Sequence, residues 1–113
     1  MHRFVFAAVL GVATSAAAQS GQSIVGTTSL LIGCRALVED APSANPMQTG
    51  ACAGAVKSAI DIGRMTRRSC PPSDDLLAAA RVVIVFADDN AKHRAEPFGV
   101  LALQALERRW PCR

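Results

Sequence analysis

The chain has 113 residues, of which 12 are basic and 9 acidic, so its net charge is only +3. This weak charge, without a basic stripe that carries interleaved aromatic residues, excludes a charge-driven nucleic-acid-binding protein. Half of the residues are hydrophobic, and the length suits one small domain.

The first 18 residues have the pattern of a secretory signal peptide. His2 and Arg3 precede an apolar run over 4–12, and three alanines at 16–18 form a small-residue cleavage site. The run is too short to span a bilayer, which needs about 20 residues. We expect cleavage after Ala18 and export to the periplasm. A flexible stretch at 19–26 and a folded domain at 27–113 would follow, with no attachment to the membrane.

The cysteines of the mature chain predict disulfides rather than a metal site. None of the four stands in a C-x-x-C pair, and the two histidines, His2 and His93, have no zinc-ligand spacing. Small exported domains commonly gain stability from disulfides. We therefore expect two disulfides and neither a metal nor another cofactor. The four residues are Cys34, Cys52, Cys70 and Cys112.

The first half of the domain predicts two helices. Apolar residues recur at helical spacing over 27–40, and Thr28 or Ser29 can cap that helix. The segment 41–50 contains two prolines, an asparagine and a glycine, which predict a loop. The second helix is expected over 51–68. Small residues recur there every four positions and predict a close backbone approach; they are Gly50, Gly54 and Ser58.

The second half predicts two more helices. The run VVIVF within 76–90 favours a strand by propensity, but the whole segment has the length of a helix and contains no turn. Ser73 is the expected N-cap. A charged loop follows at 91–96, and the last helix is expected over 97–110 with Pro97 near its first position. The fold class is therefore all-α, with four helices and short connections.

Helix geometry narrows the disulfide pairing. Cys52 and Cys70 lie at opposite ends of the second helix, roughly 20 Å apart at 1.5 Å per residue. A disulfide tolerates only about 4.4–6.8 Å between Cα atoms, which argues against pairing these two. Helices with short connections are usually antiparallel neighbours, so Cys34–Cys52 and Cys70–Cys112 are preferred. The remaining arrangement, in which Cys34 pairs with Cys70, stays open.

Four stretches carry a resemblance to a known family. They are LLIGC, GACAGAVKSAID, CPPSDDLLAA and EPFGVLALQALERRWPC, which together cover roughly residues 30–112. In this pattern the chain resembles the Rap/Tai family of type VI secretion immunity proteins. The most specific features are Cys52-Ala53-Gly54, the pair Cys70-Pro71 and the terminal Trp110-Pro111-Cys112. Ala55 and Ser58 differ from the aromatic and glycine residues common at those positions.

The resemblance implies a helical, disulfide-stabilised periplasmic protein that is often a homodimer. Its implied partner is a peptidoglycan amidase delivered by a type VI secretion system, whose catalytic cleft is occupied by a loop of the inhibitor. Such a protein has no catalysis of its own. Two other readings remain open: a periplasmic helical chaperone or stress protein, and a scaffold of the same family with another binding role.

The residues themselves suggest two binding loops. The segment 88–97 is dense in charge between two apolar helices, and loops on a rigid scaffold often carry recognition. Its candidates are Asp88, Asp89, Asn90, Lys92, His93 and Arg94. The segment 39–50 offers Met47 and is stiffened by two prolines, which lowers the entropy lost on binding. Solubility alone explains the charges of 88–97 equally well, and an ordinary connector between two helices explains 39–50. Asp88 and Asp89 would point about 100° apart on a helix, which favours a solvated helix end over a catalytic pair.

Overall fold

A computed structural model of the chain describes residue 11, residues 26–41 and residues 45–113. The helices in these residues are α2 (Thr27–Glu39), α3 (Pro46–Met65), α4 (Leu76–Asp89), the short 3-10 helix η1 (Ala91–Ala95) and α5 (Phe98–Arg109). The described residues contain no strand beyond an isolated bridge between Ser69 and Pro111. The all-α class with four main helices is thus confirmed. The signal peptide expected at 1–18 and the stretch expected at 19–26 lie outside the described residues, apart from Gly11 and Gly26.

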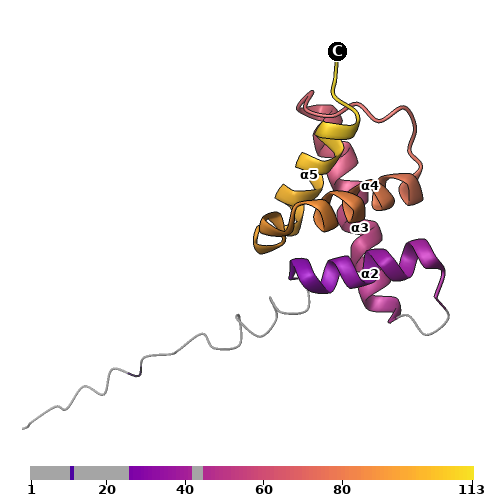
Figure 1. Cartoon of the computed structure of the whole chain (residues 1–113), viewed down its shortest axis with the longest axis vertical. Helices are drawn as coiled ribbons and strands as arrows, with labels where there is room; N and C mark the ends of the chain where they lie inside the picture. The colour runs from indigo at the N-terminus through magenta and orange to yellow at the C-terminus, as the bar shows by residue number, and fades with distance from the viewer. Residues whose placement is uncertain (1–10, 12–25, 42–44) are drawn as a thin grey trace, which may run out of the picture.

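Helix α3 is the central element of the fold (Figure 1). Helices α2 and α4 both cross it, and α5 lies beside its C-terminal half. The core forms where the apolar faces of these four helices meet, and its largest fully buried apolar side chains are Val56, Ile60, Val83, Leu101 and Leu106. None of the helices in the described part of the chain is long and apolar enough to cross a membrane.

The first disulfide joins α2 to α3 inside the core. Cys34 and Cys52 are completely buried, with their Cα atoms 5.2 Å apart. Next to them, a β-carbon on Gly33 would lie 2.1 Å from the carbonyl oxygen of Gln48, so the two helices touch backbone to backbone at this glycine. The close approach expected at Gly50 and Gly54 is wrong, because a β-carbon at either position would meet nothing within 4 Å.

Helix α3 begins five residues before the expected position. Asn45 is its N-cap, and the Asn45 side chain accepts hydrogen bonds from the backbone N–H groups of Met47 (2.9 Å) and Gln48 (3.4 Å). Pro46 takes the first helical position, where its missing N–H costs nothing. The loop predicted at 41–50 therefore ends at Asn45. Asn-Pro, which has the composition of a loop, is here the start signal of a helix.

The other end of α3 meets the C-terminus of the chain. The helix ends at Met65 rather than at residue 68, and Arg67 adopts a left-handed conformation with φ 55°. The chain then turns so that the N–H of Cys70 donates to the carbonyl of Trp110 at 2.7 Å. The second disulfide, Cys70–Cys112, joins the same two segments with a Cα separation of 4.9 Å. The C-terminal tail is therefore fixed to the body, and Trp110 packs half-buried against the core.

The caps of the other helices differ in detail from expectation. Gly26, not Thr28 or Ser29, is the N-cap of α2, and it has no side chain to donate or accept. Asp75 caps α4 by accepting from the N–H of Ala78 at 3.1 Å, while the Ser73 hydroxyl oxygen accepts from the N–H of Asp75. In both cases the hydroxyl residue lies two or three positions away from the true cap.

Candidate functional site

Residues 88–97 comprise the last two residues of α4 and the segment that joins this helix to α5, and they are called the α4–η1 turn. The charged loop predicted at 91–96 is mostly a 3-10 helix, Ala91–Ala95. The 3-10 helix matters for the site because a helical turn with internal hydrogen bonds holds its side chains in fixed directions.

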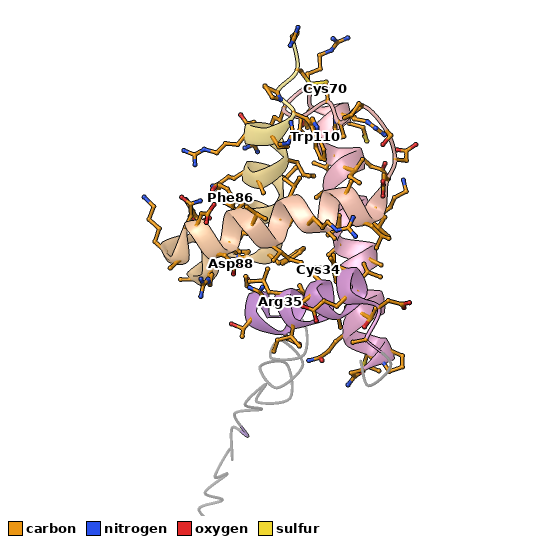
Figure 2. The ribbon with its side chains drawn as sticks, turned by 45° about the vertical axis from the view of Figure 1, so that its right-hand side comes forward. Cys34, Arg35, Cys70, Phe86, Asp88 and Trp110 are labelled. Carbon is orange, nitrogen blue, oxygen red and sulfur yellow. A yellow bond between two sulfur atoms is a disulfide. The ribbon has the colours of Figure 1, made fainter. Side chains whose placement is uncertain are left out.

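Asp88 ties the turn to α2. Its carboxylate accepts two hydrogen bonds from the Arg35 guanidinium, one of them from Nη1 to Oδ2 at 3.2 Å and the other from Nη2 to Oδ1. Figure 2 shows the two labelled residues on the neighbouring helices α2 and α4. The hydrogen bond from Arg35 lowers the pKa of Asp88 below its ordinary value, and in return Asp88 raises the pKa of Arg35. At neutral pH the Asp88 carboxylate is therefore charged, and both of its oxygens already accept hydrogen bonds from Arg35.

Two further predicted binding residues fold the turn. Arg94 Nε donates to the carbonyl of Ala87 at 2.9 Å, and its Nη2 lies 3.9 Å from Asp88 Oδ1. Asn90 donates from Nδ2 to the carbonyl of Phe86 at 3.0 Å, and its backbone N–H reaches the same oxygen. These bonds satisfy carbonyls at the C-terminal end of α4 that have no partner within the helix. Both side chains hold the turn in shape.

His93 packs against α4. Its ring stacks on Phe86 with a centroid distance of 5.2 Å, and Nδ1 lies 3.0 Å from Glu96 Oε1. The Thr27 hydroxyl at the start of α2 donates to the carbonyl of Glu96. The turn is therefore fastened to the scaffold at both of its ends, through Asp88 and through Glu96.

Asp89 and Lys92 remain as the outward-facing members of the predicted set. Both are exposed, and neither has an ion-pair partner within 4.0 Å among the residues that the structure describes. Met47 is 68% exposed, but it belongs to the first turn of α3. In Figure 1 that end of α3 and the α4–η1 turn lie on different sides of the molecule. The six residues expected at 88–97 come together, and Met47 does not join them.

A groove between α4 and α5 lies beside the turn and was not evident from the loop composition. This α4–α5 groove has a volume of about 430 Å³, and Asp89 is one of its lining residues. Apolar groups form much of its wall, including Val82, Val85, Phe86 and Ala105. Its cationic residues are Arg81 from α4 and Arg108 and Arg109 from α5.

The arginines of α5 lie over aromatic rings. The Arg108 guanidinium carbon is 5.8 Å from the centroid of Phe86, and that of Arg109 is 5.4 Å from the centroid of Trp110. Arg108 also lines a second hollow of about 570 Å³ that contains His93 and Glu107. Arg108 is thus shared between the groove and the surface of the α4–η1 turn.

One feature of the sequence is consistent with this groove, although it does not predict the groove by itself. Arg81, Val85 and Asp89 recur every four residues, so they share one face of α4. A helix as apolar as 76–90 cannot bury every face in so small a domain, and this face stays outside: Val85 is 58% exposed. In the described residues, no group of three histidine, cysteine, aspartate or glutamate side chains could hold a metal ion.

Comparisons with known proteins identify the family. No curated protein matches the chain, and no solved structure matches it. The family model described as Rap1a immunity proteins matches residues 26–112, which include all the helices described above and both disulfides. An immunity protein protects a cell by binding a secreted effector, which agrees with a rigid scaffold whose turn presents fixed charges. The chain belongs to the family of Rap1a immunity proteins.

Proposed function

We propose that the protein acts in the periplasm, where it binds and inhibits a peptidoglycan amidase delivered by a type VI secretion system. Membership of the Rap1a immunity family carries this proposal, and the resemblance to the Rap/Tai family supplies the amidase as the target. The signal-peptide pattern at 1–18 and the two disulfides support export to an oxidising compartment.

The α4–η1 turn is the segment proposed to enter the catalytic cleft of the amidase. Its shape is set before binding, by the Arg35–Asp88 pair, the Arg94–Ala87 bond and the stacking of His93 on Phe86. A segment already ordered in the free protein loses less conformational entropy on binding. Inhibition then comes from exclusion of the substrate from the cleft, with Asp89 and Lys92 as the outward charges that meet the enzyme. The protein itself performs no catalysis in this scheme.

The resemblance also supports a homodimer. We propose this assembly as a second property of the free protein, and light scattering coupled to size-exclusion chromatography tests it. A mass that matches one mature chain over the whole accessible concentration range would contradict the dimer without affecting inhibition.

Inhibition is tested with a type VI peptidoglycan amidase, beginning with any that is encoded next to this gene. The amidase is exported to the periplasm of a test strain, with and without the full-length protein, and growth is followed. The expected result is lysis with the amidase alone and normal growth when both are present. Calorimetry on the purified pair should then show a stoichiometric complex. Continued lysis, together with no binding heat, would contradict the proposed function.

A charge swap tests the turn. In Asp89→Lys combined with Lys92→Glu, both outward charges reverse while the net charge is unchanged. The matched control is Lys57→Asp with Asp61→Lys, which reverses the exposed ion pair of α3. We expect the turn variant to bind the amidase at least about 10-fold more weakly, because mismatched charges at an interface are costly. The control should bind like the wild type. Equal affinity of all three proteins would place the contact elsewhere on the surface.

A further inference from the structure

We propose that the α4–α5 groove binds a segment of the effector in which carboxylate side chains flank an apolar side chain. The proposal rests on the proposed function, since it names a second contact of the same partner. It adds an acidic docking segment, separate from the catalytic cleft that the α4–η1 turn would occupy.

The arginines of the groove are available for carboxylates. Elsewhere in the described residues four arginines already have a carboxylate within 4.0 Å, namely Arg35, Arg64, Arg68 and Arg94. Of the five described arginines without such a partner, three line this groove, namely Arg81, Arg108 and Arg109. Their charge is opposed within the groove only by Asp89. The groove therefore carries an excess of positive charge that an acidic segment would neutralise.

Cation–π contacts prepare Arg108 and Arg109 for this role. Each guanidinium carbon lies within about 6 Å of an aromatic centroid, with Arg108 over Phe86 and Arg109 over Trp110. A contact between a guanidinium and a ring does not use the N–H groups as hydrogen-bond donors, so they can still bind a carboxylate with two parallel hydrogen bonds. The aromatic rings restrict the side chains in advance, so less rotamer entropy is lost when the carboxylate binds.

The apolar wall explains why the partner segment also needs an apolar side chain. Val85, which lines the groove, is 58% exposed and shares one face of α4 with Arg81 and Asp89. The apolar surface around it gains from being covered, at roughly 25 cal/mol for each Å² removed from water. An apolar side chain on Val85, with carboxylates that reach Arg81 from α4 and Arg108 or Arg109 from α5, matches the groups that line the groove.

A synthetic peptide tests the groove without the amidase. The probe is a short peptide of alternating glutamate and leucine, added to the ¹⁵N-labelled mature protein and followed by amide chemical shifts. The expected result is saturable shifts at Val85, Arg108 and Arg109 with a Kd on the order of 1 mM. A peptide with lysine in place of glutamate, and one with alanine in place of leucine, should bind at least about 10-fold more weakly.

Matched variants locate the contact. Arg108→Gln with Arg109→Gln should abolish the peptide shifts, whereas Arg67→Gln with Arg113→Gln removes the same charge outside the groove and should leave them. Likewise Val85→Asp should abolish the shifts, whereas Val100→Asp alters an exposed valine at the start of α5 and should not. Each variant is first checked for wild-type amide dispersion. Absence of groove shifts with the wild-type protein overturns the proposal, whatever the amidase does.

Binding experiments with the amidase distinguish this proposal from the proposed function. If the amidase binds the wild type, the Arg108–Arg109 variant should bind it about 30-fold or more weakly, and the Arg67–Arg113 control should not change. Equal affinity of the two variants overturns the groove contact and leaves inhibition intact. If the peptide binds the groove but the amidase is neither bound nor inhibited, the proposed function fails and an acidic-segment site remains. Groove shifts that change on dilution without any peptide would assign the groove to a second copy of the chain, and would also overturn the proposal.

Discussion

Gly63 of α3 faces the hydroxyl of Ser69 so closely that a β-carbon on the glycine would lie 2.1 Å from the Ser69 Oγ. Ser69 is completely buried. The contact sits where α3 ends and where the tail returns, because the backbone N–H of Ser69 donates to the carbonyl of Gly63 at 3.2 Å and Ser69 bridges to Pro111. The close approach at Gly63 therefore helps to set the path of the chain into the second disulfide.

We predict that Gly63→Ala destabilises the protein by about 1–3 kcal/mol, because overpacking at a rigid contact costs that much. Gly54→Ala is the matched control in the same helix, where a β-carbon meets nothing within 4 Å. The control should gain about 0.8–1.0 kcal/mol from helix propensity alone. Urea unfolding of the two variants measures the difference. Stabilisation by both substitutions would show that Ser69 can move away from Gly63.

The sequence pattern predicts the helical frame well, because apolar periodicity reports the buried face directly. Cys34, Cys52 and Ile60 all lie on predicted faces and all are fully buried. The boundaries are less predictable: at 41–50 loop composition hides a helix start, since Asn45 and Pro46 are used as cap and first residue. The preferred disulfides are the ones in the structure, although α2 crosses α3 rather than lying antiparallel to it (Figure 1).

The site is less predictable than the frame. Charge density marks the turn at 88–97 but cannot tell which charges face outward, because that depends on partners distant in sequence such as Arg35. The groove is less evident still, since Arg108 and Arg109 look like ordinary cations at the C-terminal end of a helix. The position of Arg108 over Phe86 follows only from the packing of α4 against α5, and Arg109 lies over the ring of its own neighbour, Trp110.

The Arg35–Asp88 pair should make stability depend on pH in the acid range. The pKa of Asp88 is lowered in the folded state by the Arg35 hydrogen bond, so the unfolded chain takes up a proton at a higher pH than the folded one. The contribution is fully present above the unfolded pKa of about 3.9 and is lost as the pH falls through the lower folded pKa. Because both side chains are more than a third exposed, Asp88→Asn should cost less than about 1 kcal/mol at pH 7.

Urea unfolding of the wild type and of Asp88→Asn, repeated in steps of about one pH unit between pH 7 and pH 2, measures this dependence. The difference between the two proteins should shrink on acidification. Asp89→Asn, which removes the neighbouring carboxylate, is the control and should be neutral or slightly stabilising, because a negative charge is unfavourable at a helix C-terminus. A difference that stays constant down to the lowest pH would mean that the Asp88 carboxylate contributes through packing alone.

Removal of the second disulfide should leave a folded but less stable protein. The disulfide between Cys70 and Cys112 spans a sequence separation of 42 residues. In the chain-entropy description it stabilises the folded protein by about 4 kcal/mol. We expect Cys70→Ser with Cys112→Ser to lose about that much, and its tail beyond Arg109 to become sensitive to carboxypeptidase. Thermal unfolding and mass spectrometry of the digest measure the two effects. Unchanged melting would show that the backbone bond between Cys70 and Trp110 holds the tail without help.

The two disulfides should also differ in their reactivity toward a reductant. A thiolate must reach a sulfur atom to break the bond; Cys70 is exposed and Cys112 half-buried, whereas Cys34 and Cys52 are completely buried. We predict that low concentrations of dithiothreitol reduce Cys70–Cys112 first, so that alkylation and peptide mapping find label on these two residues alone. In urea, where burial is lost, both pairs should be labelled together. Equal labelling in the folded protein would show that the core opens as often as the tail. The burial of Cys34 and Cys52 between α2 and α3 argues against this outcome.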